Sequence, residues 1–224
     1  MKTVFEGEIL HVIPMDKGII ITYCEKRTDT QLSVAFKMIS FETGKVTNVA
    51  KNIYQLSKFG ASYRLMAEQT NNYLTCKVIS LPSEKMLIIE LDGTLKLLES
   101  DSTVLWSGQL LYKNAPPTSL ALFENKLWTC YAEHNVVVRY NINTMREELR
   151  IGGGTSSVFK QPSDIFIKHN IGYVCNPGTL QVLTLNLNTY DLEVYKEFTA
   201  PVKQYLEVDG YSFVVMENGV YLLD

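Results

Sequence analysis

The chain has 224 residues, of which 46% are apolar and 20% charged, and its formal net charge is −3. This length and composition suit one globular domain with a sizeable core, and the negative charge disfavours nonspecific binding to nucleic acid or to an anionic membrane surface. No apolar run approaches the roughly 20 residues of a membrane-spanning helix, and no secretory leader pattern opens the chain, so we expect a cytoplasmic protein.

Short strand-like runs, joined by turn residues, follow one another along the chain. The first hairpin turns at Asp16-Lys17-Gly18 and the next at Glu42-Thr43-Gly44. Later hairpins turn at Asp92-Gly93, Asn143-Thr144 and Asn188-Thr189. Between these turns, β-branched and aromatic residues alternate with polar ones, which is typical of half-buried antiparallel strands. Each pair of hairpins is therefore expected to form one four-stranded sheet, with strands that we call a to d.

A cysteine recurs in the expected b strands. The segments are GIIITYCEK (18–26), NNYLTCKVI (71–79), NKLWTCYAE (125–133) and NIGYVCNPG (170–178), and DGYSFVVMEN (209–218) has Met216 at the same place. A period of roughly 40 to 50 residues is typical of propeller blades. Because b strands lie away from the axis and no two cysteines have close ligand spacing, we expect free, buried thiols, no metal site and no cofactor.

The repeat predicts an all-β fold, a five-bladed β-propeller of four-stranded antiparallel blades. The blades are expected at about 9–56, 57–112, 113–154, 155–200, and 201–224 together with 1–8. The last unit has room for three strands, which would leave backbone donors and acceptors unpaired at its edge. We expect the N-terminal strand to fill this edge, with Thr3–Gly7 paired with Val220–Leu223. In the long second unit, residues 57–70 are interpreted as a crossing and the first strand.

The glycine-rich stretch RIGGGTSSVFKQPSDIFI (150–167) is interpreted as a crossing between two blades. A phosphate-binding loop of the Walker type would need a Gly-Lys-Ser/Thr ending and a following helix, whereas this stretch leads into a strand. From Gly152 to Ile167 it resembles the blade entry of NHL-type propellers, in which a glycine-rich passage and a proline precede an inner strand. The resemblance is to the β-propeller superfamily with NHL-like or YVTN-like repeats, and it implies a propeller fold.

No residue pattern in the chain has the form of a catalytic motif. There is no G-x-S-x-G elbow, and the three histidines are scattered, so no catalytic residue is assigned. Some five-bladed propellers are glycoside hydrolases, which use a pair of acids on opposite sides of the sugar. The inner-strand carboxylates that would be candidates for such a pair are Asp16, Glu68, Glu124, Asp164 and Glu207.

A ligand is expected at the end of the blades where the d–a and b–c loops meet. The residues placed there mix aromatic rings, charges and an amide, and they are Glu25, Arg27, Lys58, Tyr112, Tyr131, His134, Lys160, Asn176 and Glu217. Such a mixture suits a peptide, a protein or a polar small molecule. We therefore expect a non-catalytic binding or scaffolding module whose partner is a protein or peptide. A carbohydrate-binding propeller and a glycoside hydrolase are the two alternatives.

Overall fold

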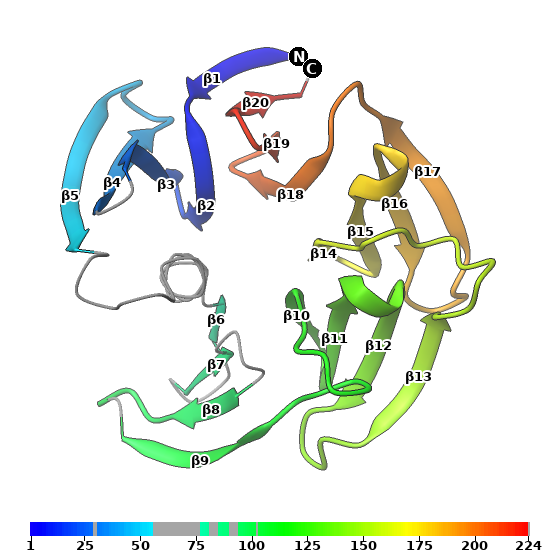
Figure 1. The fold of residues 1–224 in the computed structure, drawn as a ribbon. Coiled ribbons are helices and arrows are strands. Elements are labelled where there is room, and N and C mark those ends of the chain that lie inside the picture. The colour runs from blue at the N-terminus through cyan, green and yellow to red at the C-terminus, as the bar shows by residue number, and fades with distance from the viewer. Residues whose placement is uncertain (29–30, 56–76, 81–84, 90–93, 102, 224) are drawn as a thin grey trace. The chain divides into compact units, whose positions relative to one another are not determined.

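The computed structural model describes residues 1–28, 31–55, 77–80, 85–89, 94–101 and 103–223. Within these ranges the chain is built from strands, with two short 3-10 turns, η2 (Ala132–His134) and η3 (Pro177–Thr179). The strands form five separate four-stranded antiparallel sheets (Figure 1). This is the predicted all-β class with the predicted number of blades. No helix in the described ranges has the length and apolar character needed to cross a membrane.

The sheets are called blades 1 to 5 in chain order. Blade 1 consists of β2 (Glu8–Met15), β3 (Gly18–Arg27), β4 (Gln31–Ser40) and β5 (Val46–Gln55). Blade 2 consists of β6 (Lys77–Ser80), β7 (Met86–Ile89), β8 (Thr94–Leu98) and β9 (Val104–Gln109). Blade 3 consists of β10 (Ser119–Phe123), β11 (Lys126–Tyr131), β12 (Val136–Asn141) and β13 (Glu147–Gly152). Blade 4 consists of β14 (Asp164–Lys168), β15 (Ile171–Asn176), β16 (Gln181–Asn186) and β17 (Leu192–Glu197).

Blade 5 joins the two ends of the chain. Three of its strands are C-terminal, namely β18 (Val202–Val208), β19 (Tyr211–Met216) and β20 (Gly219–Leu222). The fourth is β1 (Lys2–Glu6), which pairs antiparallel with β20 so that Thr3 lies opposite Tyr221 and Glu6 opposite Gly219. The backbone amide of Gly7 continues this ladder by donating to the carbonyl oxygen of Asn218 at 3.0 Å. The predicted pairing of the N-terminal strand with the C-terminal one is therefore confirmed.

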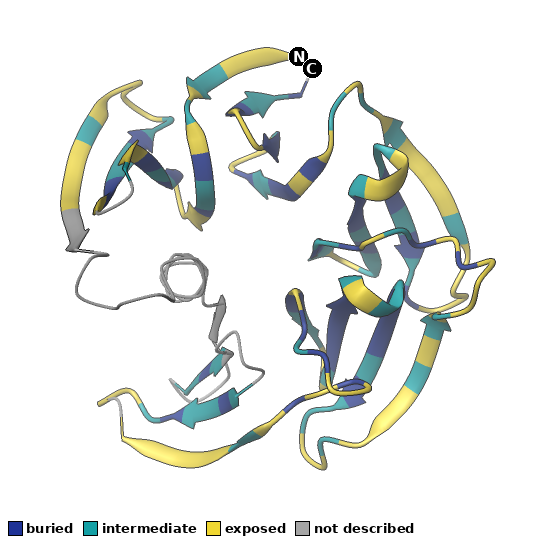
Figure 2. Ribbon diagram, viewed as in Figure 1, coloured by how far each residue is buried: buried dark blue, intermediate teal, exposed yellow. Residues whose placement is uncertain are grey.

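The blades are distributed over two compact units. The first combines residues 1–75 with 206–224, and the second spans 76–205. The core of the first unit includes Ile9, Ile21, Phe213 and Val215, all of which are buried. In the second unit, the inner strands of consecutive blades are neighbours, with β6 beside β10 and β10 beside β14. In both units the buried residues concentrate on the inner three strands of a blade, while the outer strand is largely exposed (Figure 2).

Most of the predicted hairpins are present at the predicted turns. Met15 pairs with Gly18, Tyr140 with Glu147, and Leu185 with Leu192, which places the turns as expected. The stretch after Thr144, which has some helical character in sequence, forms strand β13. Alternation of apolar and polar residues is therefore a sufficient local signal for these strands.

In blade 2 the position of each strand in the sheet differs by one from the prediction. The segment after Cys76 was expected to continue a b strand, but Lys77–Ser80 is the first strand of its sheet. The hairpin around Asp92-Gly93 exists, since Ile89 pairs with Leu95, but it joins the second and third strands rather than the last two. The last strand of the sheet is β9, which pairs with β8. Cys76 and the predicted strand within 57–70 lie outside the described residues.

The recurring cysteine position is confirmed in three blades. Cys24, Cys130 and Cys175 lie on β3, β11 and β15, the second strands of their sheets, and all three are buried free thiols. Met216 holds the same place on β19 and is 4% exposed. Burial is the main cause that raises the pKa of the Cys24 thiol, and the neighbouring Glu8 carboxylate raises it further. These side chains are core residues of the sheets, as expected for small apolar groups.

The glycine-rich stretch is the crossing from β13 of blade 3 to β14 of blade 4. Gly152 and Gly153 both have φ of +86°, a left-handed conformation that favours glycine. The carbonyl oxygen of Asn135 accepts hydrogen bonds from the Gly153 amide at 2.9 Å and from the Ser157 hydroxyl at 2.7 Å. A Cβ atom on Gly152 would lie 2.7 Å from that carbonyl oxygen. The glycines therefore permit the crossing to pack against the b–c loop of blade 3.

Candidate functional site

Three of the predicted ligand-binding residues lie in the first compact unit. Glu25 forms an ion pair with Lys51 and accepts a hydrogen bond from Ser33, and the contact with Lys51 is the main cause that lowers the pKa of Glu25. Arg27 forms an ion pair with Glu8, with 2.6 Å between Nη2 and Oε1. Arg27 therefore links β3 to its neighbour β2, and Glu25 links β3 to both β4 and β5.

Glu217 is also in the first unit, in the exposed turn between β19 and β20, where its carbonyl oxygen accepts a hydrogen bond from the amide of Ile9. Lys58 lies outside the described residues.

Three other predicted residues form an aromatic cluster in the second unit. Tyr112 lies in the crossing after β9, Tyr131 ends β11, and His134 is in η2. The ring of Tyr112 is 5.4 Å from that of Tyr131 and 5.3 Å from that of His134. The guanidinium of Arg150 covers the Tyr112 ring at 4.9 Å. These three residues therefore lie together, but Tyr131 is fully buried and Tyr112 is 6% exposed.

The last two predicted residues, Lys160 and Asn176, are joined by a hydrogen bond that stabilises the crossing into blade 4. The Asn176 side chain is fully buried. Its oxygen accepts a hydrogen bond from the Lys160 amide, and its Nδ2 donates to the carbonyl oxygen of Val158 at 3.1 Å and to the Thr179 hydroxyl at 2.8 Å. Because these contacts occupy the amide group, Asn176 positions a loop and leaves little surface for a ligand.

The candidate carboxylates do not converge on one site in the described residues. Glu124 is in the turn after β10, whereas Asp164 begins β14, which puts the two at opposite ends of their sheets. Asp164 is buried and accepts a hydrogen bond from the Ser119 hydroxyl at 2.6 Å. Asp16 and Glu207 belong to the first compact unit, and Glu68 lies outside the described residues. No group of three or more His, Cys, Asp or Glu in the described ranges is arranged to hold a metal ion.

A second candidate site lies at the end of the blades opposite the predicted ligand face, where the a–b and c–d turns meet. It is a cavity of about 530 Å³ between blades 2 and 3, and we call it the inter-blade cavity. Its apolar walls are provided by Leu87, Leu95, Leu97, Trp106, Leu122, Ile142 and Met145. Its polar lining is provided by Lys85, Glu124, Asn125, Asn143 and Thr144. Apolar walls with a few polar groups are typical of a ligand-binding site.

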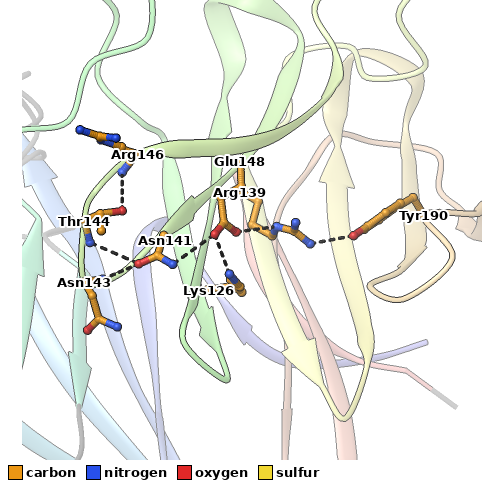
Figure 3. Close-up of polar contacts among 8 residues, drawn as sticks. All are labelled: Lys126, Arg139, Asn141, Asn143, Thr144, Arg146, Glu148 and Tyr190. Atoms are coloured by element: carbon orange, nitrogen blue, oxygen red, sulfur yellow. Dashed lines mark hydrogen bonds and ion pairs between the residues drawn. The ribbon is translucent and has the colours of Figure 1, made fainter.

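A smaller cavity of about 220 Å³ occurs between blades 3 and 4, and we call it the Arg139 site. The Arg139 guanidinium lies 5.6 Å from the centres of both the Trp128 and the Tyr190 rings. It donates a hydrogen bond to the Tyr190 hydroxyl at 2.7 Å and forms an ion pair with Glu148 at 3.3 Å (Figure 3). Aromatic faces and a carboxylate thus surround this cation.

Glu148 connects the charges of the Arg139 site. Its carboxylate accepts hydrogen bonds from Lys126 at 2.6 Å and from Asn141 at 3.1 Å (Figure 3). The contact with Lys126 is the main cause that lowers the pKa of Glu148, followed by the contact with Asn141. The carboxylate therefore stays ionised and fixes both cations of the site.

The inter-blade cavity and the Arg139 site are equivalent positions in successive blades. On the b and c strands, Leu87 pairs with Leu97 in blade 2 as Trp128 pairs with Arg139 in blade 3. The c–d turn of the next blade closes each site, with Met145 in the first and Tyr190 in the second.

The two closing turns have the same construction. The oxygen of the Asn141 side chain accepts hydrogen bonds from the amides of Asn143 and Thr144, and Asn186 does the same for Asn188 and Thr189. Met145 and Tyr190 both have positive φ, at 52° and 65°. The shared Asn-x-Asn-Thr pattern in these turns is a sequence signal that could have indicated this end of the blades.

Comparison with known proteins supports the fold and gives no information on activity. No protein-family model and no curated protein matches the chain. Among solved structures, streptogramin B lyase has a TM-score of 0.53 at 10% identity, covering 98% of this chain and 69% of that one. The computationally designed Ika8 protein has a TM-score of 0.49 at 9% identity, covering 96% of this chain and 83% of that one. The designed Ika4 protein has a TM-score of 0.46 at 14% identity, covering 64% and 86%. The likeness to the lyase supports the β-propeller fold.

Proposed function

We propose that the protein is a non-catalytic binding module that holds a peptide, a protein segment or a small polar ligand in the inter-blade cavity. The β-propeller fold suggests a binding or scaffolding role, and it leaves the partner open because propellers serve many functions. The observation that carries the proposal is the cavity of about 530 Å³, whose apolar walls are accompanied by a small number of polar groups.

This proposal moves the ligand from the end of the blades favoured by the sequence to the opposite end. The predicted face has its aromatic and amide groups committed to internal contacts, since Tyr131 and Asn176 are buried. By contrast, the ring of Trp106 lines the inter-blade cavity and is 44% exposed. Membership of the NHL-type subfamily and a cytoplasmic location remain part of the proposal.

The two alternatives make different demands on the site. A lectin with several equal sites would repeat the same polar and aromatic side chains in each blade, yet Leu97 and Arg139 hold the same place in the two described cavities. A glycoside hydrolase would place two carboxylates in one pocket. Glu124 is the single carboxylate among the described residues that line the inter-blade cavity. The first comparison disfavours a lectin with equal sites, and the second disfavours a glycoside hydrolase.

The test is a fragment and peptide screen observed by amide chemical shifts. We expect at least one ligand to shift the amides of Leu87, Ile142 and Met145, and to lose affinity at least tenfold in a Met145→Tyr variant, because the larger ring fills the cavity. Tyr190 shows that the equivalent turn accepts this ring at positive φ. The matched control is Val194→Tyr, on the exposed outer strand of blade 4.

Two results would contradict the proposal. One is a set of ligands that shift Tyr112, His134 and Lys160 and leave the cavity unchanged, which would restore the face predicted from sequence. The other is turnover of a glycoside substrate that disappears in Glu124→Gln, which would make the protein a hydrolase.

A further inference from the structure

We infer that the ligand of the inter-blade cavity is an organic cation with an apolar body, an inference that rests on the function proposed above. The cation is either a free aryl- or alkylamine or the side chain of an arginine or lysine in a peptide. The inference comes from comparing the cavity with its equivalent one blade further on, where the protein supplies the cation itself.

The Arg139 site shows what this inter-blade position accommodates. The apolar stem and guanidinium of Arg139 occupy the space between Trp128 and Tyr190, and 19% of the side chain is exposed. The remaining hollow is about 220 Å³. A long side chain that ends in a positive charge therefore fills this position, with aromatic rings on its faces and a carboxylate at its end.

In the inter-blade cavity the corresponding side chains are shorter and uncharged. Leu97 takes the place of Arg139, Leu87 that of Trp128, and Met145 that of Tyr190. Among the described residues no cationic side chain takes the place of Arg139, and the hollow is more than twice as large, at about 530 Å³. The apolar walls favour an apolar ligand body, because burying such a surface removes it from water.

The charges at the cavity favour a positive head on that body. Lys85 also lines the cavity, and its ammonium is 3.7 Å from the Glu99 carboxylate, which balances its charge. The Glu124 carboxylate is exposed and makes no hydrogen bond or ion pair with any other residue in the described part of the chain. Within the described residues, this carboxylate therefore has no cationic side chain in contact with it, although it also lines the Arg139 site with Lys126.

The Trp106 ring offers a second contact for a cation. It lines the same cavity and is 44% exposed, so part of its surface is available to a ligand. The ring is held in place over Gly108, where a Cβ atom would lie 2.5 Å from the indole carbons. A cation on an exposed indole face is attracted by the negative potential of the ring. Glu124 and Trp106 together favour a cation over a neutral group of the same shape.

The test uses three probes with one apolar body, namely phenylbutylammonium, phenylbutanol and phenylbutyrate. Binding is followed by tryptophan fluorescence, since Trp106 is one of two tryptophans and the other, Trp128, is 1% exposed. We expect the ammonium to bind about tenfold more tightly than the alcohol, and the carboxylate to bind most weakly. Glu124→Gln should reduce the ammonium to the affinity of the alcohol, while Glu193→Gln, at an exposed acid of blade 4, should change nothing.

The source of the cation is distinguished with two peptides. A capped Leu-Arg-Leu peptide is compared with the same peptide in which citrulline, a neutral isostere, replaces arginine. A preference for the arginine peptide over phenylbutylammonium would identify a protein partner, and the reverse would identify a small amine. The double variant Leu97→Arg with Met145→Tyr places two side chains of the Arg139 site in the inter-blade cavity. It should abolish binding of every probe. Met145→Tyr alone serves if the double variant does not fold.

The possible failures have separate meanings. Equal binding of ammonium, alcohol and carboxylate would overturn the inference about charge and would leave the proposed function intact, because the cavity would still bind the apolar body. Absence of binding by all probes and peptides would overturn the inference. The amide-shift screen then decides separately whether the cavity binds another class of ligand or none.

Discussion

Tyr131 illustrates how a residue predicted to bind a ligand instead stabilises the fold. Its ring is fully buried at the end of β11, and its hydroxyl is 3.1 Å from that of Tyr140. Burial is the main cause that raises the pKa of both phenols above the usual range. In the unfolded chain a tyrosine ionises near pH 10. Above that pH, unfolding therefore releases protons from this pair, and the stability of the protein falls as the pH rises.

We expect Tyr131→Phe to make the protein less sensitive to alkaline pH. Above about pH 10 its free energy of unfolding should fall less steeply than that of the wild type, by about 1.4 kcal/mol per pH unit, because one fewer proton is released. At neutral pH the variant should be about 1 kcal/mol less stable, since Tyr140 loses a hydrogen-bond partner. Urea unfolding at several pH values measures both effects. Tyr211→Phe, at a half-exposed ring, is the matched control, and parallel slopes for all three proteins would contradict the expectation.

Strand β1 shows at the scale of one element why the chain ends meet. It covers the edge of β20, and its Phe5 ring packs on Tyr23 of β3 with 4.8 Å between centroids. The ammonium of Lys37 lies over both rings, at 5.2 Å and 5.3 Å. The strand therefore supplies backbone hydrogen bonds to blade 5 and side-chain contacts to blade 1. An uncovered edge of β20 would also be free to pair with another chain.

Deletion of residues 1–7 is expected to lower the free energy of unfolding by about 3 kcal/mol, the typical effect of losing a packed phenylalanine. The truncated protein should also self-associate through the exposed edge of β20. Unfolding in urea and sedimentation velocity measure the two effects. A synthetic peptide with the sequence of residues 1–8 should restore stability, whereas a scrambled peptide should not. A truncated protein as stable as the full chain would show that β1 is dispensable.

Blade 2 shows why a strand can be predicted while its place in a sheet is not. The runs at 86–89, 94–98 and 104–109 all form strands, as expected from their β-branched and apolar residues. Their order in the sheet depends on packing, because Leu87 and Leu95 join Leu120 and Leu127 in one buried cluster. Because the strands have similar local patterns, the sequence does not show which position each strand takes in its sheet. Placing Cys76 on the second strand therefore shifted the predicted blade by one strand.

At the scale of the whole molecule, the first compact unit is assembled from both ends of the chain. It contains residues 1–75 and 206–224, so segments that are far apart in the sequence form one unit. Lys2 pairs with Leu222, which brings the two termini of the described chain side by side (Figure 1). The pairing of β1 with β20, rather than the position of the chain break, therefore defines this sheet.

A circular permutant should test this view. Joining residues 1 and 224 with a short Gly-Ser linker and opening the chain at Gly44 should give a folded protein at least as stable as the wild type, because the ends of β1 and β20 can no longer fray. Gly44 is in an exposed turn, and a Cβ atom there would meet nothing within 4 Å.

The control is a permutant opened at Gly153, whose amide donates to Asn135; it should be less stable. Thermal unfolding compares the two, and equal stabilities would contradict the expectation.

The strands, the turns and the shared last blade could be read from the amino acids because their causes are local. Asp16-Lys17-Gly18 and Asn143-Thr144 have the chemistry of tight turns, and the thiol of Cys130 is small enough to recur in a core. The pairing of Thr3–Gly7 with the C-terminal strand could be predicted because the last unit lacked one strand. Each of these inferences needed no knowledge of which sheet packs against which.

The candidate site required the folded molecule. The inter-blade cavity exists because Leu97, Met145 and Trp106 come together from two sheets, and no spacing in the chain marks them as neighbours. The same is true of Tyr131 and Asn176, whose burial removed them from the surface where their residue types had placed them. The physical reason is that strand formation depends on each segment's own residues, whereas a cavity depends on the sizes of side chains that meet only when two sheets pack.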